Sequence, residues 1–178
     1  MTLVTPHALQ CCHIFLGYLV TDLVALLLYG NQWKGTGIYL VHHITGLWTW
    51  GLLATQGHCL GVAVSFLLCE TTAPFTNGRW FLSTLGYSSG PTYAINGILM
   101  FFSFLAFRIL LMGGLFVKYM WLLRAPLFAL PVSTYLTCIF SFCIGYPMQL
   151  FWFRKIAVGL LKVLQAGSKG SAVKLGKD

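Results

Sequence analysis

Long apolar stretches, each close to the length that crosses a bilayer, dominate this chain. A membrane-spanning helix needs about 20 mostly apolar residues, each rising about 1.5 Å. The chain offers about five such stretches, at residues 10–30, 36–55, 59–75, 92–112 and 125–153. Only 8% of the residues are charged, whereas a soluble domain carries about a quarter. Because the bilayer accepts so much apolar surface, we predict an all-α, polytopic transmembrane helix bundle.

Turn-forming residues set the expected ends of these stretches. Pro74 and then Asn77 and Gly78 are expected to stop the third stretch, and residues 76–90 form the longest polar stretch between spans. Residues 109–125 are predicted to form either a short interfacial helix or a half-buried one. The last stretch contains three prolines, which predict kinks: Pro126, Pro131 and Pro147.

The charge distribution predicts the orientation in the membrane. The formal net charge is +8, and six of the 11 cations follow residue 153. Cytosolic segments carry an excess of Lys and Arg, so we expect the C-terminus in the cytosol beside anionic lipid. Residues 1–165 are then one transmembrane domain and residues 166–178 a disordered basic tail. No nucleic-acid-binding motif accompanies the basic charge, and nucleic acid is not an expected partner.

The six cysteines lie within or beside the apolar stretches. No pair has the spacing of a zinc site, so they are expected to act as small hydrophobic residues rather than as metal ligands or a disulfide framework.

Asp22 lies in the middle of the first stretch, where an isolated carboxylate is costly. It is therefore expected to be protonated, paired, or facing a wet cavity. Two interpretations are open: a buried acid that locks helix packing, and an acid with a functional role.

His42 and His43 are adjacent in the second stretch. Neighbours on a helix point about 100° apart, so the two cannot share one metal in the usual i, i+4 manner, and no metal site is predicted. One is expected to face the interior and the other to orient or bond it. A neutral imidazole can act as a base, a nucleophile or a hydrogen-bond donor. The alternative is a polar contact between helices.

Glu70 is the only other acid in the apolar stretches. Its candidate partners are Arg79 and Arg108, and a structural ion pair is the favoured interpretation.

Several segments carry a family resemblance: GYLVTDL at 17–23, YLVHHITG at 39–46, LLCETTAPFTNGRWF at 67–81, NGILM at 96–100, and Arg108. Together they resemble the TLC-domain family, which includes the ceramide synthases, over about residues 16–165. The resemblance implies a multi-pass helical bundle of the endoplasmic reticulum or a connected secretory membrane, with a role in lipid homeostasis.

In the ceramide synthases a histidine pair and several acids form the acyl-transfer site. By position, the resemblance carries this role only to Asp22, His42 and His43, and the further acids of the ceramide synthase signature are missing. The other polar residues of the matching segments are expected to form a lipid-binding or structural network: Glu70, Asn77, Arg79, Asn96 and Arg108. Since the family's domain usually begins with at least one more span, the chain is expected to be short at its N-terminus.

Three functions are the resulting hypotheses. The first is a protein that binds or senses a membrane lipid, for which a sphingolipid is a candidate. The second is an acyl-CoA-dependent N-acyltransferase with an intramembrane histidine, for which acyl-CoA is a substrate and no cofactor is expected. The third is a cargo or chaperone-like membrane adaptor. The sequence leaves the oligomeric state open.

Overall fold

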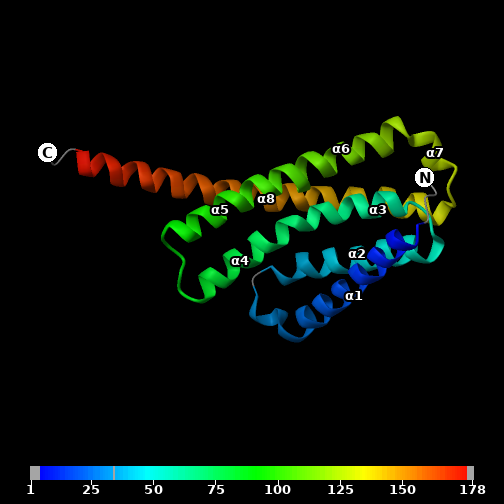
Figure 1. Ribbon diagram of the computed structural model, residues 1–178, viewed down its shortest axis with the longest axis horizontal. Helices are drawn as coiled ribbons and strands as arrows, with labels where there is room; N and C mark the ends of the chain where they lie inside the picture. Colours follow the sequence, from blue (N-terminus) through cyan, green and yellow to red (C-terminus); the bar gives the residue numbers. More distant parts are fainter. Residues whose placement is uncertain (1–4, 34, 176–178) are drawn as a thin grey trace. The chain divides into compact units, whose positions relative to one another are not determined.

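Helices joined by short turns make up the protein (Figure 1). The computed structural model describes residues 5–33 and 35–175, the side chains of Leu164 and residues 166–175 excepted. No strand occurs in this part of the chain, which confirms the predicted all-α fold. The α-helices are α1 (Pro6–Tyr29), α2 (Thr36–Gln56), α3 (Leu60–Leu67), α4 (Ala73–Thr84), α5 (Pro91–Ser103), α6 (Met112–Val117), α7 (Arg124–Phe128) and α8 (Val132–Leu175). Four tighter or wider helical segments join some of them: η1 (Gly30–Gln32) and η2 (Leu68–Thr72) are 3₁₀-helical, while η3 (Phe104–Leu111) and η4 (Lys118–Leu122) are π-helical.

Three helical stretches in the described part are long and apolar enough to cross a membrane: Pro6–Gln32, Pro91–Leu122 and Val132–Val163. Length and composition alone therefore support fewer spans than the five expected. The predicted second span, α2, has 21 residues but carries both His42 and His43, which makes it less apolar. The predicted third span is divided among α3, η2 and α4.

Pro91–Leu122 is one continuous helical stretch, whereas the sequence predicted a span at residues 92–112 and a separate helix at residues 109–125. No proline interrupts it after Pro91, so the helix can continue through η3, α6 and η4. The helix therefore does not end at residue 112, where the predicted span ends.

Pro74 and Gly78 do not stop the helix, contrary to the prediction from the sequence. Pro74 lies in the first turn of α4, where its missing N–H is not needed, and α4 continues to Thr84. The helix ends there because Gly86, two residues further on, has a φ of 84°, in the left-handed region that favours glycine. The N–H groups of Gly86 and Tyr87 donate to the carbonyls of Ser83 and Leu82, which is a Schellman motif.

The predicted last span begins later than residue 125. Residues 124–128 form the separate short helix α7, and α8 begins at Val132, directly after Pro131. Proline disfavours helical backbone at the residue before it, which explains the break. Pro147 lies inside α8. The helix continues to Leu175, into the segment predicted to be disordered, since extending an existing helix costs less than starting one. The last three residues lie outside the described part.

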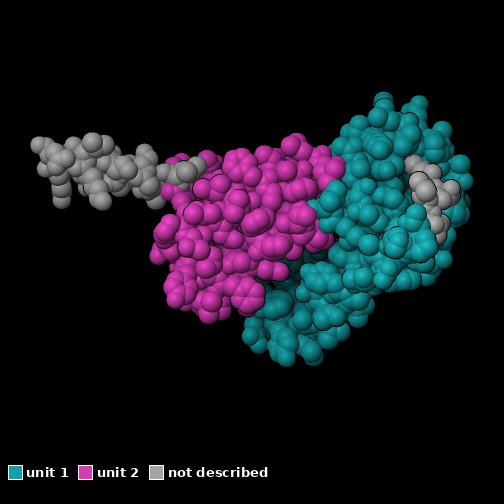
Figure 2. Space-filling model, viewed as in Figure 1, with its two compact units in different colours: residues 1–68, 112–148 teal, residues 69–111, 149–178 magenta. Residues whose placement is uncertain are grey.

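The chain divides into two compact units (Figure 2). The first comprises residues 1–68 and 112–148, and its core joins Trp50 and Leu53 of α2 to Leu60 of α3 and Cys138 of α8. Hydrogen bonds between side chains also join α2 to α8. The bonded pairs are Trp48 with Thr137, Thr49 with Ser141, and Gln56 with Ser133 and Thr134. Such polar contacts hold helices together where the surroundings are as apolar as the side chains.

The second unit comprises residues 69–111 and 149–178. Phe153 of α8 packs on Phe101 and Phe104, with ring centroids 5.2 and 6.2 Å apart. Asn96 of α5 donates its side-chain N–H to the carbonyl of Phe75 in α4 at 2.9 Å. Aromatic packing therefore joins α8 to α5 and η3, and a side-chain hydrogen bond joins α5 to α4.

A glycine pair in α6 tests the packing of the first unit. A Cβ at Gly113 would lie 2.7 Å from the hydroxyl of Tyr146, whereas a Cβ at Gly114 would meet nothing within 4 Å. We expect Gly113→Ala to destabilise the protein by about 1–3 kcal/mol through overpacking. Gly114→Ala is the matched control, and it should be neutral or stabilising by up to about 1 kcal/mol. Thermal unfolding in detergent, followed by circular dichroism, measures both; equal midpoints would contradict this packing.

Candidate functional site

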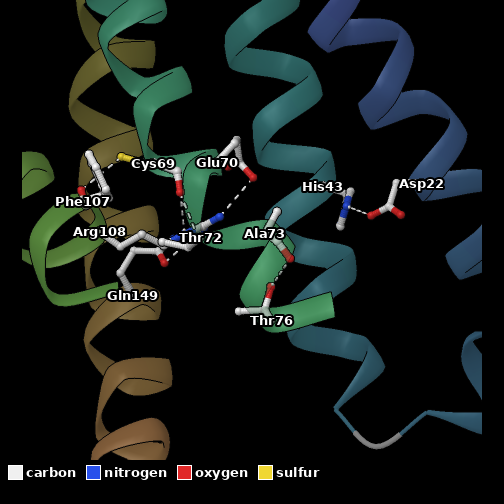
Figure 3. Close-up of polar contacts among 10 residues, drawn as sticks. All are labelled: Asp22, His43, Cys69, Glu70, Thr72, Ala73, Thr76, Phe107, Arg108 and Gln149. Atoms are coloured by element: carbon white, nitrogen blue, oxygen red, sulfur yellow. Dashed lines mark hydrogen bonds and ion pairs between the residues drawn. The ribbon is translucent and has the colours of Figure 1, made fainter. Parts of the chain in front are cut away.

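Asp22 of α1 and His43 of α2 form a pair across the first helical hairpin (Figure 3). The Oδ2 atom of Asp22 lies 2.5 Å from Nε2 of His43. The other ring nitrogen, Nδ1, lies 2.8 Å from the backbone carbonyl of Tyr39, one turn earlier in α2. Both nitrogens of the imidazole are therefore engaged.

These contacts fix where the protons are. A carbonyl oxygen only accepts, so Nδ1 of His43 must carry a proton and donate to Tyr39. The short contact between Nε2 and Asp22 then holds one further proton. Either an imidazolium donates to a carboxylate, or a protonated Asp22 donates to a neutral imidazole. The pair is neutral overall in both forms, which lowers the cost of placing it in an apolar stretch.

The two partners differ in exposure. The side chain of His43 is 9% exposed, while that of Asp22 is 45% exposed. His42 is half-buried, and its ring meets that of His43 edge to face at a centroid distance of 5.5 Å. The structure thus joins all three residues that the resemblance singles out, with His43 at the centre and Asp22 as the group that a ligand can reach.

Arg108 is the centre of a second polar cluster, which lies in the second unit (Figure 3). Of the two partners considered for Glu70, the structure pairs it with Arg108, at 3.0 Å from Nη2. Nε of Arg108 donates to the carbonyl of Cys69 at 3.1 Å and to the hydroxyl of Thr72 at 2.7 Å. Nη1 donates to Gln149 of α8 at 3.4 Å. The guanidinium therefore ties η2, η3 and α8 together.

Irregular helical turns supply the groups that Arg108 bonds. Cys69 and Thr72 lie in the 3₁₀ segment η2, and Arg108 lies in the π segment η3. The thiol of Cys69 donates to the carbonyl of Phe107 at 3.3 Å. Mid-helix π turns are rare and often lie at functional positions. Sequence reasoning missed Cys69, Thr72 and Gln149, because a regular helix does not predict these irregular turns.

The remaining members of the predicted polar network do not join this cluster. Asn96 donates to the carbonyl of Phe75, and Asn77 is exposed. Arg79 lies against Tyr93, with its guanidinium carbon 4.0 Å from the ring centroid. Asn96 and Arg79 therefore make separate contacts within the second unit and do not extend the Arg108 cluster into one continuous polar network.

Within the described residues, no group of three or more His, Cys, Asp or Glu side chains is placed to hold a metal ion. The chemistry available at Asp22 and His43 is proton transfer and hydrogen bonding. At the Arg108 cluster all the contacts are internal, and Thr72 and Gln149 are 0% and 3% exposed. Most of the Arg108 cluster is therefore enclosed, although Glu70 is 30% exposed, and the half-exposed Asp22–His43 pair is the stronger candidate site.

The profile of the TLC domain matches residues 2–158. TLC domain-containing protein 4 of Homo sapiens is 32% identical over 155 residues, which are 83% of this chain and 57% of the relative. TLC domain-containing protein 4-B of Danio rerio is 31% identical over 162 residues, or 86% of this chain and 59% of the relative. The chain thus spans less than two thirds of the length of these relatives. No solved structure matches.

Removing Asp22 should destabilise the first unit. In Asp22→Leu the buried Nε2 of His43 loses its partner, and we expect a loss of about 2 kcal/mol. This is less than the 3–5 kcal/mol typical of a fully buried pair, because Asp22 is half exposed. Asp22→Leu combined with His43→Leu should recover part of the loss, and Thr21→Val, at an exposed neighbour on α1, is the control. Unfolding midpoints of these variants, of His43→Leu alone and of the parent in detergent measure the coupling, and additive effects would show that the two side chains do not interact.

Arg108→Lys should destabilise the protein although it keeps the charge. Lysine can hold Glu70 but cannot reproduce the planar set of bonds to Cys69, Thr72 and Gln149. We expect a loss of at least about 2 kcal/mol in unfolding experiments. Arg124→Lys is the matched control, since Arg124 is exposed, and should stay within about 0.5 kcal/mol of the parent. A midpoint for Arg108→Lys close to that of Arg124→Lys would show that the charge alone matters.

Proposed function

Because this chain belongs to the TLC-domain family, we propose that it is a membrane protein of lipid homeostasis that binds or senses a membrane lipid at the Asp22–His43 pair. The observation that carries the proposal is the half-exposed carboxylate of Asp22, held by a buried histidine on an apolar helix.

The exposed half of Asp22 favours a ligand that donates hydrogen bonds. Tyr18 and Tyr29 lie on the same face of α1 as Asp22, one turn before it and two turns after it, and are 47% and 55% exposed. The hydroxyl of Thr21 is occupied by the carbonyl of Gly17 at 2.9 Å. A hydrocarbon chain can therefore lie along α1 while a hydroxyl, amide or amine group reaches the carboxylate.

Depth in the membrane favours a lipid with a small head group. Asp22 lies ten residues before Gln32, at the end of the candidate span Pro6–Gln32, which is roughly 15 Å along a helix. A phosphate would be repelled by the carboxylate and costly to bring to this depth. A sphingoid base or a ceramide fits better, since both carry hydroxyl groups next to an amine or amide.

The histidine geometry favours binding over acyl transfer through His43. An acyl carrier or a base needs a free nitrogen lone pair, and both ring nitrogens of His43 are engaged. Acyl transfer from acyl-CoA is nevertheless a second candidate, because the exposed Asp22 carboxylate shares a proton with His43 and can pass it to a ligand.

The cellular location belongs to the proposal as well. The cation excess after residue 153 supports a C-terminus in the cytosol. The family supports the endoplasmic reticulum or a connected secretory membrane. Protease accessibility of a C-terminal epitope in sealed microsomes tests the orientation, and protection of the epitope would contradict it.

Native mass spectrometry tests lipid binding directly. The full chain in mild detergent is titrated with ceramide and with sphingosine, beside Asp22→Asn and the control Thr21→Val. We expect Asp22→Asn to weaken binding about tenfold, the loss of one charge-assisted hydrogen bond, and Thr21→Val to leave binding unchanged. Equal binding by the parent and Asp22→Asn would contradict the proposal.

Incubation with a long-chain acyl-CoA separates binding from transfer. An added acyl mass on the intact protein that disappears in His42→Ala would replace lipid binding by acyl transfer as the function. So would N-acylsphingosine and free coenzyme A formed from added sphingosine by the parent but not by Asp22→Asn. The proposal expects neither an adduct nor this product.

A further inference from the structure

The second unit contains a pocket of about 590 Å³ that shares no residue with the Asp22–His43 pair. Its size falls within the range of roughly 300–1,000 Å³ common for small-molecule sites. α4, the loop before α5, α5 itself and α8 all contribute to its lining. Because neither Asp22 nor His43 lines this pocket, a proposal about its ligand stands apart from the function proposed for that pair.

Among the described residues, two cations line this pocket without a counter-ion. Arg79 comes from α4 and Lys155 from α8. The part of the chain that the structure describes holds only two carboxylates, Asp22 and Glu70, and both are paired with other residues. The pocket is therefore positively charged and suited to an anion.

The side chain of Arg79 is held in place. Its guanidinium carbon lies 4.0 Å from the ring centroid of Tyr93, and Nη1 donates to the carbonyl of the same residue at 3.5 Å. It also lies against Gly97, where a Cβ would come within 2.6 Å of Nη1. An arginine has five N–H donors, and the described residues accept from one of those of Arg79. The rest are available to a ligand in the pocket, in the planar arrangement that matches a phosphate.

Lys155 is positioned by an aromatic ring in a similar way. Its Nζ lies 4.3 Å from the ring centroid of Phe151, one turn earlier in α8. The hydroxyl-bearing residues Ser88, Ser89 and Tyr93 also line the pocket, which adds neutral donors to the two charges. Together these groups can surround a phosphate with charged and neutral hydrogen-bond donors.

The remaining wall of the pocket is apolar. Met100 of α5 and Ile156, Leu160 and Val163 of α8 line it. Ser88 and Ser89 directly precede the candidate span Pro91–Leu122, whereas Met100 lies inside that span. Ser88 and Ser89 thus mark the surface end of the pocket. On α8, Lys155 and the apolar residues Ile156, Leu160 and Val163 all lie within the candidate span Val132–Val163.

We propose that this pocket binds the phosphate group of a membrane amphiphile, with Arg79 and Lys155 as its charged ligands and the hydrocarbon chain along the wall that includes Met100 and Leu160. A soluble phosphate needs no such wall, so a lipid is the source that fits. The charge count favours the cytosolic side of the membrane for Arg79 and Lys155, where anionic lipids are enriched.

Binding of lysophosphatidic acid to the full chain in non-ionic detergent tests the proposal, with native mass spectrometry as the measurement. Monoacylglycerol of the same chain length lacks the phosphate and should bind at least about tenfold more weakly. Lys155→Gln and Arg79→Gln should each weaken lysophosphatidic acid binding about tenfold. Arg154→Gln, which removes the same charge from an exposed neighbour outside the lining, should have less than about a twofold effect.

Two further variants keep the result interpretable. Gly97→Ala displaces the guanidinium without removing its charge and should also weaken binding, while Asp22→Asn should leave binding unchanged. Lys155 is exposed, so Lys155→Gln should unfold at the parent's midpoint, and a loss of binding then reports the site and not the fold. Equal binding by the parent and Lys155→Gln would overturn the proposal. So would displacement of the lipid by inorganic phosphate or coenzyme A at equal concentration, since the site would then belong to a soluble ligand.

Discussion

Hydrocarbon offers no hydrogen-bond partner, so each polar side chain inside an apolar helix must find one within the protein. This constraint selects the contacts that join the helices. In the first unit Asp22 bonds His43 across the hairpin, and hydroxyl and amide groups join α2 to α8. In the second unit Arg108 satisfies a carboxylate, a carbonyl, a hydroxyl and an amide at once. The few polar groups of the chain thus determine which helix faces pack together. Apolar side chains alone do not, because lipid tails are equally apolar neighbours.

Irregular turns are the local means by which the second unit meets this constraint. In a regular α-helix each backbone carbonyl accepts a hydrogen bond from an N–H group of the same helix. In η2 and η3 the pattern changes, and the carbonyls of Cys69 and Phe107 accept from the Arg108 guanidinium and the Cys69 thiol. The irregular turns thus free the carbonyl of Cys69 that the buried Arg108 guanidinium needs as a hydrogen-bond acceptor. By contrast, α1 and α2 stay regular, because each of their charged partners is satisfied by a side chain or by a carbonyl one turn away.

The sequence predicted those features that depend on composition or on single costly residues. Apolar length predicted helices, and the cost of a mid-membrane carboxylate gave a partner for Asp22 as one of three expected outcomes, beside protonation and a wet cavity. It could not choose between His42 and His43, because the choice depends on how α1 and α2 rotate against each other. The expected stop at Pro74 was wrong, since a proline in the first turn of a helix breaks nothing. The contacts of Thr72 and Gln149 could not be foreseen, because they need both the irregular turns and the pairing of segments about 40 residues apart. The pocket around Arg79 likewise depends on α8 reaching α5, which no local pattern encodes.

The pairing of Asp22 with a residue of the next helix has a consequence for biosynthesis. The acid is made 21 residues before its partner, as the sequence separation shows. An aspartate at the centre of a helix costs about 2.5–3.5 kcal/mol to insert by itself. The first helix therefore gains its full stability in the bilayer only when the second has left the ribosome, and the two are expected to enter the membrane as one hairpin. The pairing of Asp22 with His43 is thus expected to help membrane entry, whatever the candidate site binds, because the acid can lie at mid-membrane depth without leaving a net charge there.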